Sequence, residues 1–200
     1  MVKLNKIYTR TGDAGTTGLV DGSRIAKSAP LMGAVGDVDE ANSAIGLAVA
    51  ALPEGAPEAA MLARIQNEMF DLGADLAAPA DAEHGFGPHD MALRIVPDQI
   101  ERLEAEIDAM NEALAPLASF ILPGGTEAAA RLHLARAIAR RAERTAVAAG
   151  ETRDLNPLAL AYLNRLSDHL FVMTRAINAA AGGDILWQPG ATRVSPGASG

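Results

Sequence analysis

The sequence predicts an all-α protein: a five-helix antiparallel bundle with ferritin-like, up-and-down architecture, preceded by a glycine-rich loop. The apolar residues are mostly Ala and Leu, which favour helices, and aromatic residues make up only 4% of the chain. Five segments carry apolar residues every three or four positions, and prolines or glycines separate them. We therefore divide a single domain into an N-terminal loop (1–28), a helical bundle (29–182) and a C-terminal tail (183–200).

The first two helices are expected over 29–52 and 57–76, where Pro53 and Gly55 separate them. The apolar stripe of the second helix is Met61, Ile65, Met69 and Leu72. An interior loop, 77–90, follows. The preceding N-terminal loop shows little periodicity, and we expect only a short extended piece, Lys6–Thr9, in it.

The third helix is expected to begin near Pro97, because proline is favoured in a first helical turn. Its apolar positions are Ile100, Leu103, Ile107, Met110 and Leu114. The fourth helix is expected from Thr126, a suitable N-cap, to residue 149. The fifth runs from Pro157 to the glycines at 182 and 183, which are typical of helix ends. The Pro/Gly/Ser-rich tail beyond Trp187 is expected to be disordered.

The composition excludes several classes of site. There is no cysteine, so disulfides, thiolate metal sites and a cysteine nucleophile are excluded. The net charge of −8 argues against a general nucleic-acid binder. No apolar run approaches the roughly 18 residues of a membrane span, and no signal peptide is recognisable. We therefore expect a cytoplasmic protein without membrane or nucleic-acid partners.

The stretch TRTGDAGTTGL places three glycines, Gly12, Gly15 and Gly18, among four threonines. Glycines allow a close backbone approach, and amides and hydroxyls can donate to phosphate oxygens. Lys6, Arg10 and Lys27 flank the stretch with positive charge. The stretch lacks the lysine of a Walker A loop, so the motif alone leaves two interpretations: an anion cradle or an ordinary terminal loop.

The fourth helix carries a group of arginines on one side. Arg136, Arg140, Glu143 and Arg144 fall together when residues are placed 100° apart, with His133 near them. Like charges at this spacing repel by about 0.2–0.5 kcal/mol per pair. The group is either a solvated helix face or an anion site in which guanidiniums hold phosphate oxygens; a nucleic-acid contact is disfavoured by the acidic total.

Polar residues also occur near apolar seams. Asn164, Asp168 and Phe171 lie beside the seam of the fifth helix and are either a helix–helix contact or ligand-facing groups. Asp37, Asp39 and Glu40 fit acids placed at a helix N-terminus. Alternatively, one of these aspartates pairs with an arginine of the fourth helix.

Histidines give no recognisable catalytic set. We interpret His84, His89, His133 and His169 as surface or core-edge residues. No helix carries Glu-x-x-His, so a di-iron carboxylate site lacks its ligands. No Ser/His/Asp set can be assembled from the spacing either.

Five segments in this order resemble one family, the PduO-type corrinoid adenosyltransferases. They are TRTGDAGTTGL, GDVDEANSAIG, FILPGG, LHLARAIARRAER and YLNRLSDHLF, and they span residues 9–171. The resemblance implies a homotrimer of five-helix subunits with active sites between them. It also implies the reaction: ATP gives its 5′-deoxyadenosyl group to the cobalt of cob(I)alamin, and triphosphate leaves. Because cobalt is the nucleophile, the protein supplies positioning and charge stabilisation.

Site residues follow from the matched motifs. The residues that would wrap the triphosphate are Thr9, Arg10, Thr11, Gly12, Asp13, Gly15, Thr16 and Thr17. Lys27 would also face the nucleotide. The resemblance implies that Arg140 and Glu143 contact ATP, and that Asn164 helps to bind it. Asp39 would pair with Arg136.

Phe120, in FILPGG, would approach the lower face of the corrin and help to displace the lower cobalt ligand. Mg²⁺ is implied as the partner of the triphosphate, with ligands that the motifs do not name. A cobalamin reductase and an adenosylcobalamin-dependent mutase are implied partners.

The chain departs from the family pattern mildly around Asp39, where Asp37 adds a negative charge. Trp187 matches no motif; it would cover the corrin or anchor the C-terminus. Two other functions remain open: a non-catalytic bundle that senses or delivers ATP or corrinoid, and a structural bundle with a solvated arginine face.

Overall fold

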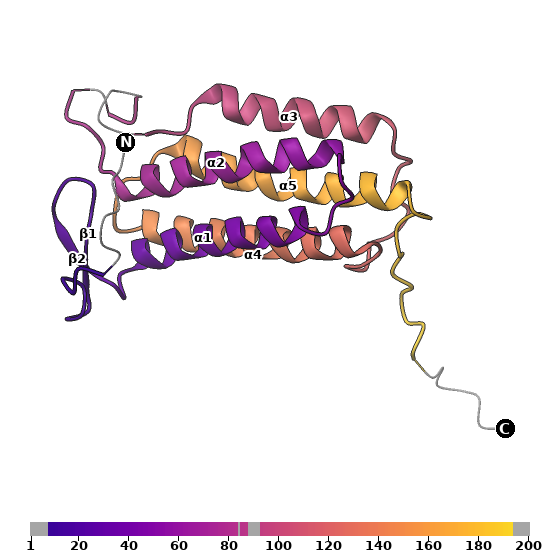
Figure 1. Ribbon diagram of the computed structural model, residues 1–200, viewed down its shortest axis with the longest axis horizontal. Helices are drawn as coiled ribbons and strands as arrows, with labels where there is room; N and C mark the ends of the chain where they lie inside the picture. Colours follow the sequence, from indigo (N-terminus) through magenta and orange to yellow (C-terminus); the bar gives the residue numbers. More distant parts are fainter. Residues whose placement is uncertain (1–7, 84, 88–92, 194–200) are drawn as a thin grey trace.

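The computed structural model describes residues 8–83, 85–87 and 93–193, and within them the chain forms a helical bundle with a small hairpin (Figure 1). The elements are β1 (Thr16–Gly18), β2 (Arg24–Ala26), α1 (Pro30–Val49), α2 (Pro57–Ala77), α3 (Pro97–Glu112), α4 (Glu127–Gly150) and α5 (Pro157–Ala179). All five predicted helices are confirmed. Their bounds differ from the expected ones by up to three residues where an end could be predicted.

Four helices enclose most of the core, and α3 lies at its edge and contributes Leu103 to it. Helix α1 packs against α4 and α2, α4 packs against α5, and α3 lies on α5. Cross-helix contacts fix the directions: Asn42 of α1 meets Gln66 of α2, and Glu143 of α4 meets Asn164 of α5. Successive helices are therefore antiparallel, as predicted, whereas α3 runs parallel to its neighbour α5.

Local signals explain where the helices begin. Four of them have proline in the first turn, where its missing N–H costs nothing. The exception is α4, whose N-cap is Thr126 as predicted: its hydroxyl accepts a hydrogen bond from the amide of Ala129, at 3.2 Å. Such caps contribute about 1 kcal/mol.

The N-terminal loop corrects one expectation. Strands β1 and β2 pair in antiparallel register, Thr17 opposite Ile25. Of the extended piece expected at 6–9, residues 8 and 9 lie in no strand, and the rest lies outside the described residues. Each strand has only three residues, too few for an alternating apolar pattern to be visible in the sequence.

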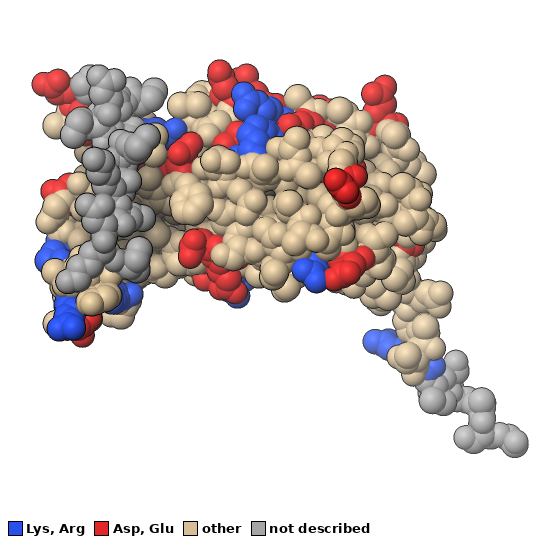
Figure 2. Space-filling view, in the orientation of Figure 1, with Lys and Arg blue, Asp and Glu red and all other residues tan. Residues whose placement is uncertain are grey.

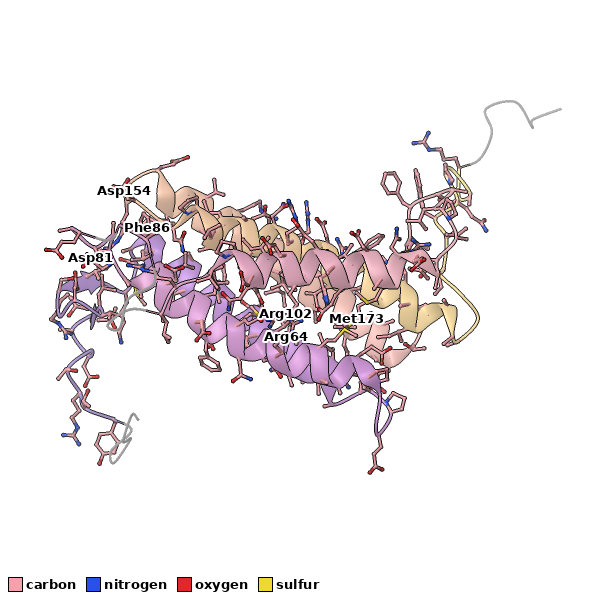
Figure 3. All side chains as sticks on the ribbon, turned by 90° about the horizontal axis from the view of Figure 1, so that it is seen from above. Arg64, Asp81, Phe86, Arg102, Asp154 and Met173 are labelled. Carbon is pink, nitrogen blue, oxygen red and sulfur yellow. The ribbon has the colours of Figure 1, made fainter. Side chains whose placement is uncertain are left out.

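Helix α3 packs less deeply than its apolar spacing suggests. Leu103 is its only fully buried residue, and side-chain ion pairs attach the helix to the bundle. Glu106 accepts from Arg64 of α2 at 2.6 Å and contacts His169 of α5 at 2.8 Å. Arg102 lies beside Arg64 in Figure 3, and both arginines contact Glu68 of α2.

These charged groups affect one another. Burial alone would raise the pKa of Glu106, but the hydrogen bond with His169 and the charge of Arg64 lower it below its usual value. Burial and the nearby Glu68 carboxylate raise the pKa of Tyr162 well above its usual value. The Tyr162 hydroxyl donates to Glu68 at 2.8 Å.

A buried polar cluster closes the end of the bundle where α2 stops. Arg94 donates to Asp75 Oδ1 at 2.8 Å, and both side chains are almost completely buried. The other carboxylate oxygen of Asp75 accepts from the amide of Ile95 and from Asn156, the N-cap of α5. One aspartate thus joins the end of α2, the approach to α3 and the start of α5.

The two ends of the bundle carry different features. The hairpin lies at the end where α1 begins, whereas the connection from α3 to α4 and the segment after α5 lie at the opposite end (Figure 1). Since α1 has 20 residues, these ends are about 30 Å apart at 1.5 Å per residue. In the described part of the chain, none of the helices has the length and apolar character needed to cross a membrane.

Candidate active site

The glycine-rich loop forms a polar pocket beside the start of α1. The residues that line it are Tyr8, Thr9, Arg10, Thr11, Gly12, Asp13, Thr16, Thr17, Gly18, Arg24 and Lys27. Basic side chains gather at this hairpin end of the molecule in Figure 2. A Cβ on Gly12 would lie 3.1 Å from Lys27 Nζ, so glycine lets that ammonium approach. The loop residues expected to bind nucleotide therefore share one pocket, except Gly15, which does not line it. Lys6, expected to flank the loop, lies outside the described residues.

The loop backbone is strained at one predicted site residue. Arg10 has φ 61°, and within the described residues it is the only one other than glycine with positive φ. Such conformations cost on the order of 1–3 kcal/mol and concentrate at functional sites. Gly15 also has a positive φ, 80°, but glycine adopts this conformation without strain because it has no Cβ. Its carbonyl accepts a hydrogen bond from the amide of Lys27 at 2.8 Å.

Arg24 braces this loop, and the sequence did not single it out. Its Nη2 donates to the carbonyl of Thr11 at 2.7 Å and to Thr16 Oγ1 at 2.9 Å. Arg24 reaches both only because β2 pairs with β1. No motif marks it, so the hairpin would have to be predicted first.

The arginines of α4 present unused hydrogen-bond donors. The guanidinium of Arg136 lies 5.9 Å from the ring centre of Phe171 on α5, and its buried Nε has no partner in the structure. Burial lowers the pKa of Arg136, and the charge of nearby Arg140 lowers it further. Arg140 is exposed, and no ion pair involves it among the described residues. Two adjacent cations without a carboxylate partner suit an anion.

Glu143 and Asn164 meet where α4 and α5 face each other. Asn164 Nδ2 donates to Glu143 Oε1 at 2.9 Å, and Asn164 Oδ1 accepts from Arg165 Nη1 at 2.9 Å. The two predicted nucleotide residues are therefore neighbours. Together with Arg136 and Arg140 they form a polar strip along α4 and α5, which we call the α4–α5 face.

The acidic residues of α1 divide between two sides of the helix. Asp37 accepts from Arg141 at 3.2 Å and from Thr145 at 2.9 Å, and Glu40 also pairs with Arg141. An aspartate thus pairs with an arginine of α4, one of the two open interpretations, but the arginine is Arg141. None of the acids lies in the first turn of α1, so they are not the N-terminal helix acids of the other interpretation.

Asp39 points away from α4. It follows Asp37 by two residues, or about 200° around the helix, and it lines a groove between α1 and α2. The other residues of this groove are Met32, Val35, Gly36, Val38, Asn42, Met69, Phe70 and Gly73. Since Arg136 instead contacts Phe171 of α5, these two predicted partners face different sides of the chain.

Phe120 lies at the far end of the bundle from the loop, and its side chain is 77% exposed. Its ring centre is 5.9 Å from that of Trp187, and the carbonyl of Phe120 accepts from the amide of Trp187 at 2.8 Å. The two rings line an apolar pocket of about 490 Å³ with Leu117, Ala118, Ser119 and Pro189. Phe120 is therefore not a core residue.

Comparison with known proteins gives this geometry its context. The family model described as cobalamin adenosyltransferase matches residues 7–177. A corrinoid adenosyltransferase of Mycobacterium tuberculosis is 48% identical over 199 residues, covering 97% of this chain and 98% of the relative. The chain belongs to the cobalamin adenosyltransferase family.

Other relatives agree with this membership. A cobalamin adenosyltransferase of Cupriavidus metallidurans is 48% identical and covers 93% of this chain and 96% of its own. A solved structure of a variant PduO-type ATP:corrinoid adenosyltransferase from Lactobacillus reuteri, complexed with cobalamin and ATP, superposes with a TM-score of 0.82. It is 36% identical and covers 92% of this chain and 99% of its own. The family resemblance read from the five motifs is confirmed.

The second glycine of FILPGG, Gly125, is required by its backbone conformation and by its close contact with Asn178. Gly125 has φ 102°, and a Cβ on it would lie 2.1 Å from Asn178 Oδ1. Asn178 accepts from the amide of Thr126 at 3.1 Å and donates to the carbonyl of Gly124 at 3.1 Å. Asn178 thereby fixes the start of α4 after the Phe120 segment, a role that no sequence pattern indicated.

The segment after α5 is also tied to the bundle. Arg175 donates to the carbonyl of Ala115 at 2.7 Å and to Asp184 at 3.1 Å. Ile121 and Leu186 form an isolated antiparallel bridge. The tail therefore helps to build the Phe120 pocket through Trp187 and also through Pro189, which lies in the part that was expected to be disordered. Residues 194–200 lie outside the described residues.

The helical histidines are more buried than expected. His133 and His169 are 3% and 0% exposed. Neither ring nitrogen of His133 has a hydrogen-bond partner among the described residues, and its ring packs edge-on against Phe171 at 6.4 Å. Burial and the charge of Arg136 lower the pKa of His133, and Asp184 opposes them. His84 and His89 lie outside the described residues.

Proposed function

We propose that this chain carries out the adenosyl transfer of its family in sites shared between two copies of the chain. ATP would lie between the loop pocket of one copy and the α4–α5 face of another, with the corrin over Phe120. One observation carries this proposal: the hairpin with its loop pocket and the connection from α3 to α4, which contains Phe120, lie at opposite ends of a bundle about 30 Å long. The short triphosphate chain of one ATP cannot span that distance, but a second copy can bring the two together.

The reaction requires little covalent chemistry from the protein. Cobalt(I) of the reduced corrinoid attacks C5′ of ATP, the cobalt–carbon bond forms, and the C5′–oxygen bond breaks. Triphosphate leaves with the bonding electron pair. Positioning and stabilisation of the leaving negative charge are then the contributions that accelerate the step.

The loop and the α4–α5 face would divide this work. Arg10 and Lys27 would neutralise the triphosphate while the loop amides and threonine hydroxyls donate to its oxygens. Arg140, which is exposed and without a described ion-pair partner, would add charge from the second copy. Glu143 can only accept hydrogen bonds, so it would contact a donor of the nucleoside rather than a phosphate.

Phe120 would act from below the corrin. Its exposed ring has no donor or acceptor, so it would exclude water and any polar lower ligand from cobalt. Cobalt without that ligand is more easily reduced, which favours the cob(I) nucleophile. Trp187, which contacts Phe120, would form the side of the same apolar site.

Asp39 and Arg136 would pair across the subunit interface. Each faces away from the other within one chain. The surface over α1 and α2 has a broad uncharged area (Figure 2), which suits contact with another subunit. A trimer would place the Asp39 groove of one copy against the α4–α5 face of the next, and closed cyclic symmetry would repeat the contact.

Magnesium fits as a partner of ATP rather than of a protein cage. The described residues contain no group of three or more His, Asp or Glu side chains placed to hold a metal. Mg²⁺ commonly binds substrate phosphates, water and one or two carboxylates, and Asp13 is the carboxylate that lines the loop pocket. Asp13 would hold the ion, which would screen the triphosphate charge.

Cellular context follows from the chemistry. The corrinoid must be reduced to cobalt(I), so a reductase would supply electrons. The product, adenosylcobalamin, would be consumed by a radical enzyme such as a mutase. We place the reaction in the cytoplasm.

The reaction can be tested by anaerobic spectroscopy. Purified protein is mixed with ATP, Mg²⁺, cob(II)alamin and a strong reductant, and the visible spectrum is followed. We expect adenosylcobalamin bands that depend on ATP.

Arg140→Ala should raise the activation free energy of the reaction by on the order of 1.5–3 kcal/mol, because the variant loses a charged hydrogen bond to the substrate. Unchanged kinetics in that variant would contradict the role of Arg140, and corrinoid binding without a cobalt–carbon bond would favour a sensor or carrier.

A further inference from the structure

We propose that Arg165 is a positioning residue that orients the amide of Asn164 toward the nucleotide. This inference rests on the proposed role of Asn164 in binding ATP. An asparagine amide can rotate by a half-turn and exchange its donor and acceptor with little change in shape. A nucleotide site that uses this amide therefore needs neighbours that fix its orientation.

The two neighbours of Asn164 permit one orientation. Glu143 Oε1, an acceptor, lies 2.9 Å from Nδ2, and Arg165 Nη1, a donor, lies 2.9 Å from Oδ1. Arginine has no acceptor and an ionised carboxylate has no donor. A flipped amide would therefore place two donors together at one end and two acceptors at the other. In the observed orientation, one Nδ2 hydrogen makes no hydrogen bond with the described residues and can donate to a ligand.

Arg165 is itself held by a third helix. Its Nε donates to Glu104 Oε1 of α3 at 2.6 Å, while Nη1 reaches Asn164. The planar guanidinium can donate in both directions at once, which a lysine ammonium on a flexible stem does less specifically. A continuous chain of contacts thus runs from Glu143 on α4 through Asn164 and Arg165 on α5 to Glu104 on α3.

The arrangement is more specific than a surface ion pair. Both Arg165 and Glu104 are partly exposed, with side chains 39% and 45% accessible, so the pair by itself contributes little to stability. Its consequence lies in the position of Asn164, next to the arginines of the α4–α5 face. Arg165 also offsets the negative charge of Glu143 near a polyanionic substrate.

The test is a double-mutant cycle read by ATP binding. Isothermal titration calorimetry gives the ATP dissociation constant of the assembled protein for wild type, Arg165→Ala, Asn164→Ala and the double variant. We expect Arg165→Ala to weaken ATP binding about tenfold, the effect of one charged hydrogen bond. In the Asn164→Ala background it should have less than about a twofold effect, because coupled residues are not additive.

The matched control is Arg102→Ala. Arg102 also lies on the protein surface and also links α3 to the bundle, through Glu68 at 3.5 Å, but it does not contact Asn164 in any described interaction. It should leave ATP binding unchanged. An equal loss in Arg102→Ala, or an equal effect of Arg165→Ala with and without Asn164, would overturn the proposal.

Two further readouts separate causes. Arg165→Lys should recover part of the lost affinity, whereas no recovery together with a lowered melting temperature would indicate a structural role and overturn the proposal. Because the assay measures binding, it remains readable if no adenosylcobalamin forms. In that case the proposed function fails while the role of Arg165 stands or falls on its own result.

Discussion

At the scale of single residues, the candidate site contains a buried guanidinium nitrogen without a hydrogen-bond partner among the described residues and an exposed aromatic ring. The Arg136 guanidinium lies over the ring of Phe171 instead of pairing with a carboxylate, and Phe120 is exposed although it is large and apolar. Unpaired charges and exposed aromatic rings are costly in an isolated subunit. In the function proposed above, a ligand or a second subunit would cover both groups.

Phe120→Ala should slow corrinoid adenosylation while leaving ATP affinity nearly intact, because in the proposed function the ring would contact the corrin, and it does not line the loop pocket. The measurement is initial rate against ATP and against cob(II)alamin concentration. Leu122→Ala is the matched control, since Leu122 is an exposed apolar residue of the same segment. Equal losses of ATP affinity and rate would count against the lower-face role.

His133 should make stability depend on pH. Burial and Arg136 lower its folded-state pKa below the usual value, so the unfolded chain binds more protons between the two pKa values. Stability should be constant above the unfolded pKa, near 6.5, and fall as the pH decreases toward the folded value. Melting temperatures from pH 7.5 to 5 should show a smaller fall in His133→Gln; identical pH profiles would contradict this account.

At the scale of elements, the apolar periodicity of the sequence predicted the five helices but not the β-hairpin, which forms by pairing between two short segments. The five helices follow from apolar spacing and from proline and glycine, because these act within a few residues. The hairpin and the bracing role of Arg24 depend on contacts between segments that share no local pattern. The apolar spacing of α3 overestimated its burial because polar contacts such as Arg165 with Glu104 replace apolar ones.

The site residues divide in the same way. Motif resemblance assigned Glu143, Asn164 and the loop residues to one nucleotide, and the structure shows that Asn164 contacts Glu143 and that most of the loop residues line one pocket. The resemblance could not show that Asp39 faces away from α4, or that Asp37 of α1 pairs with Arg141. Two residues 200° apart on a helix are neighbours in sequence but not in space.

Asp75→Ala should be one of the most destabilising substitutions at a helix end. It would leave the buried guanidinium of Arg94 without its carboxylate and remove a partner of Asn156. Breaking a buried ion pair costs about 3–5 kcal/mol. Urea unfolding would measure the loss against Arg102→Ala, whose exposed pair should cost about 1 kcal/mol or less. Similar losses for both would contradict the buried-cluster assignment.

At the scale of the whole molecule, each chain would contribute to two shared sites, with its loop in one and its α4–α5 face in the other. The hairpin, which carries the loop pocket, lies at one end of the bundle, and the connection from α3 to α4, which carries Phe120, lies at the other (Figure 1). A copy would therefore offer its loop to one neighbour and its α4–α5 face to another. In the proposed arrangement, Asp39 of one copy would pair with Arg136 of another.

Complementation between two inactive variants tests this central claim most directly. Arg10→Ala with Lys27→Ala disables the loop, Arg140→Ala disables the α4–α5 face, and the two chains are co-expressed and assayed for adenosylcobalamin formation. If each site combines two chains, random assembly leaves about a quarter of the sites intact, and activity should return to roughly that fraction of wild type. If mixed assemblies stay as inactive as either variant alone, the loop and the α4–α5 face serve the same site within one chain, and the shared-site account is wrong.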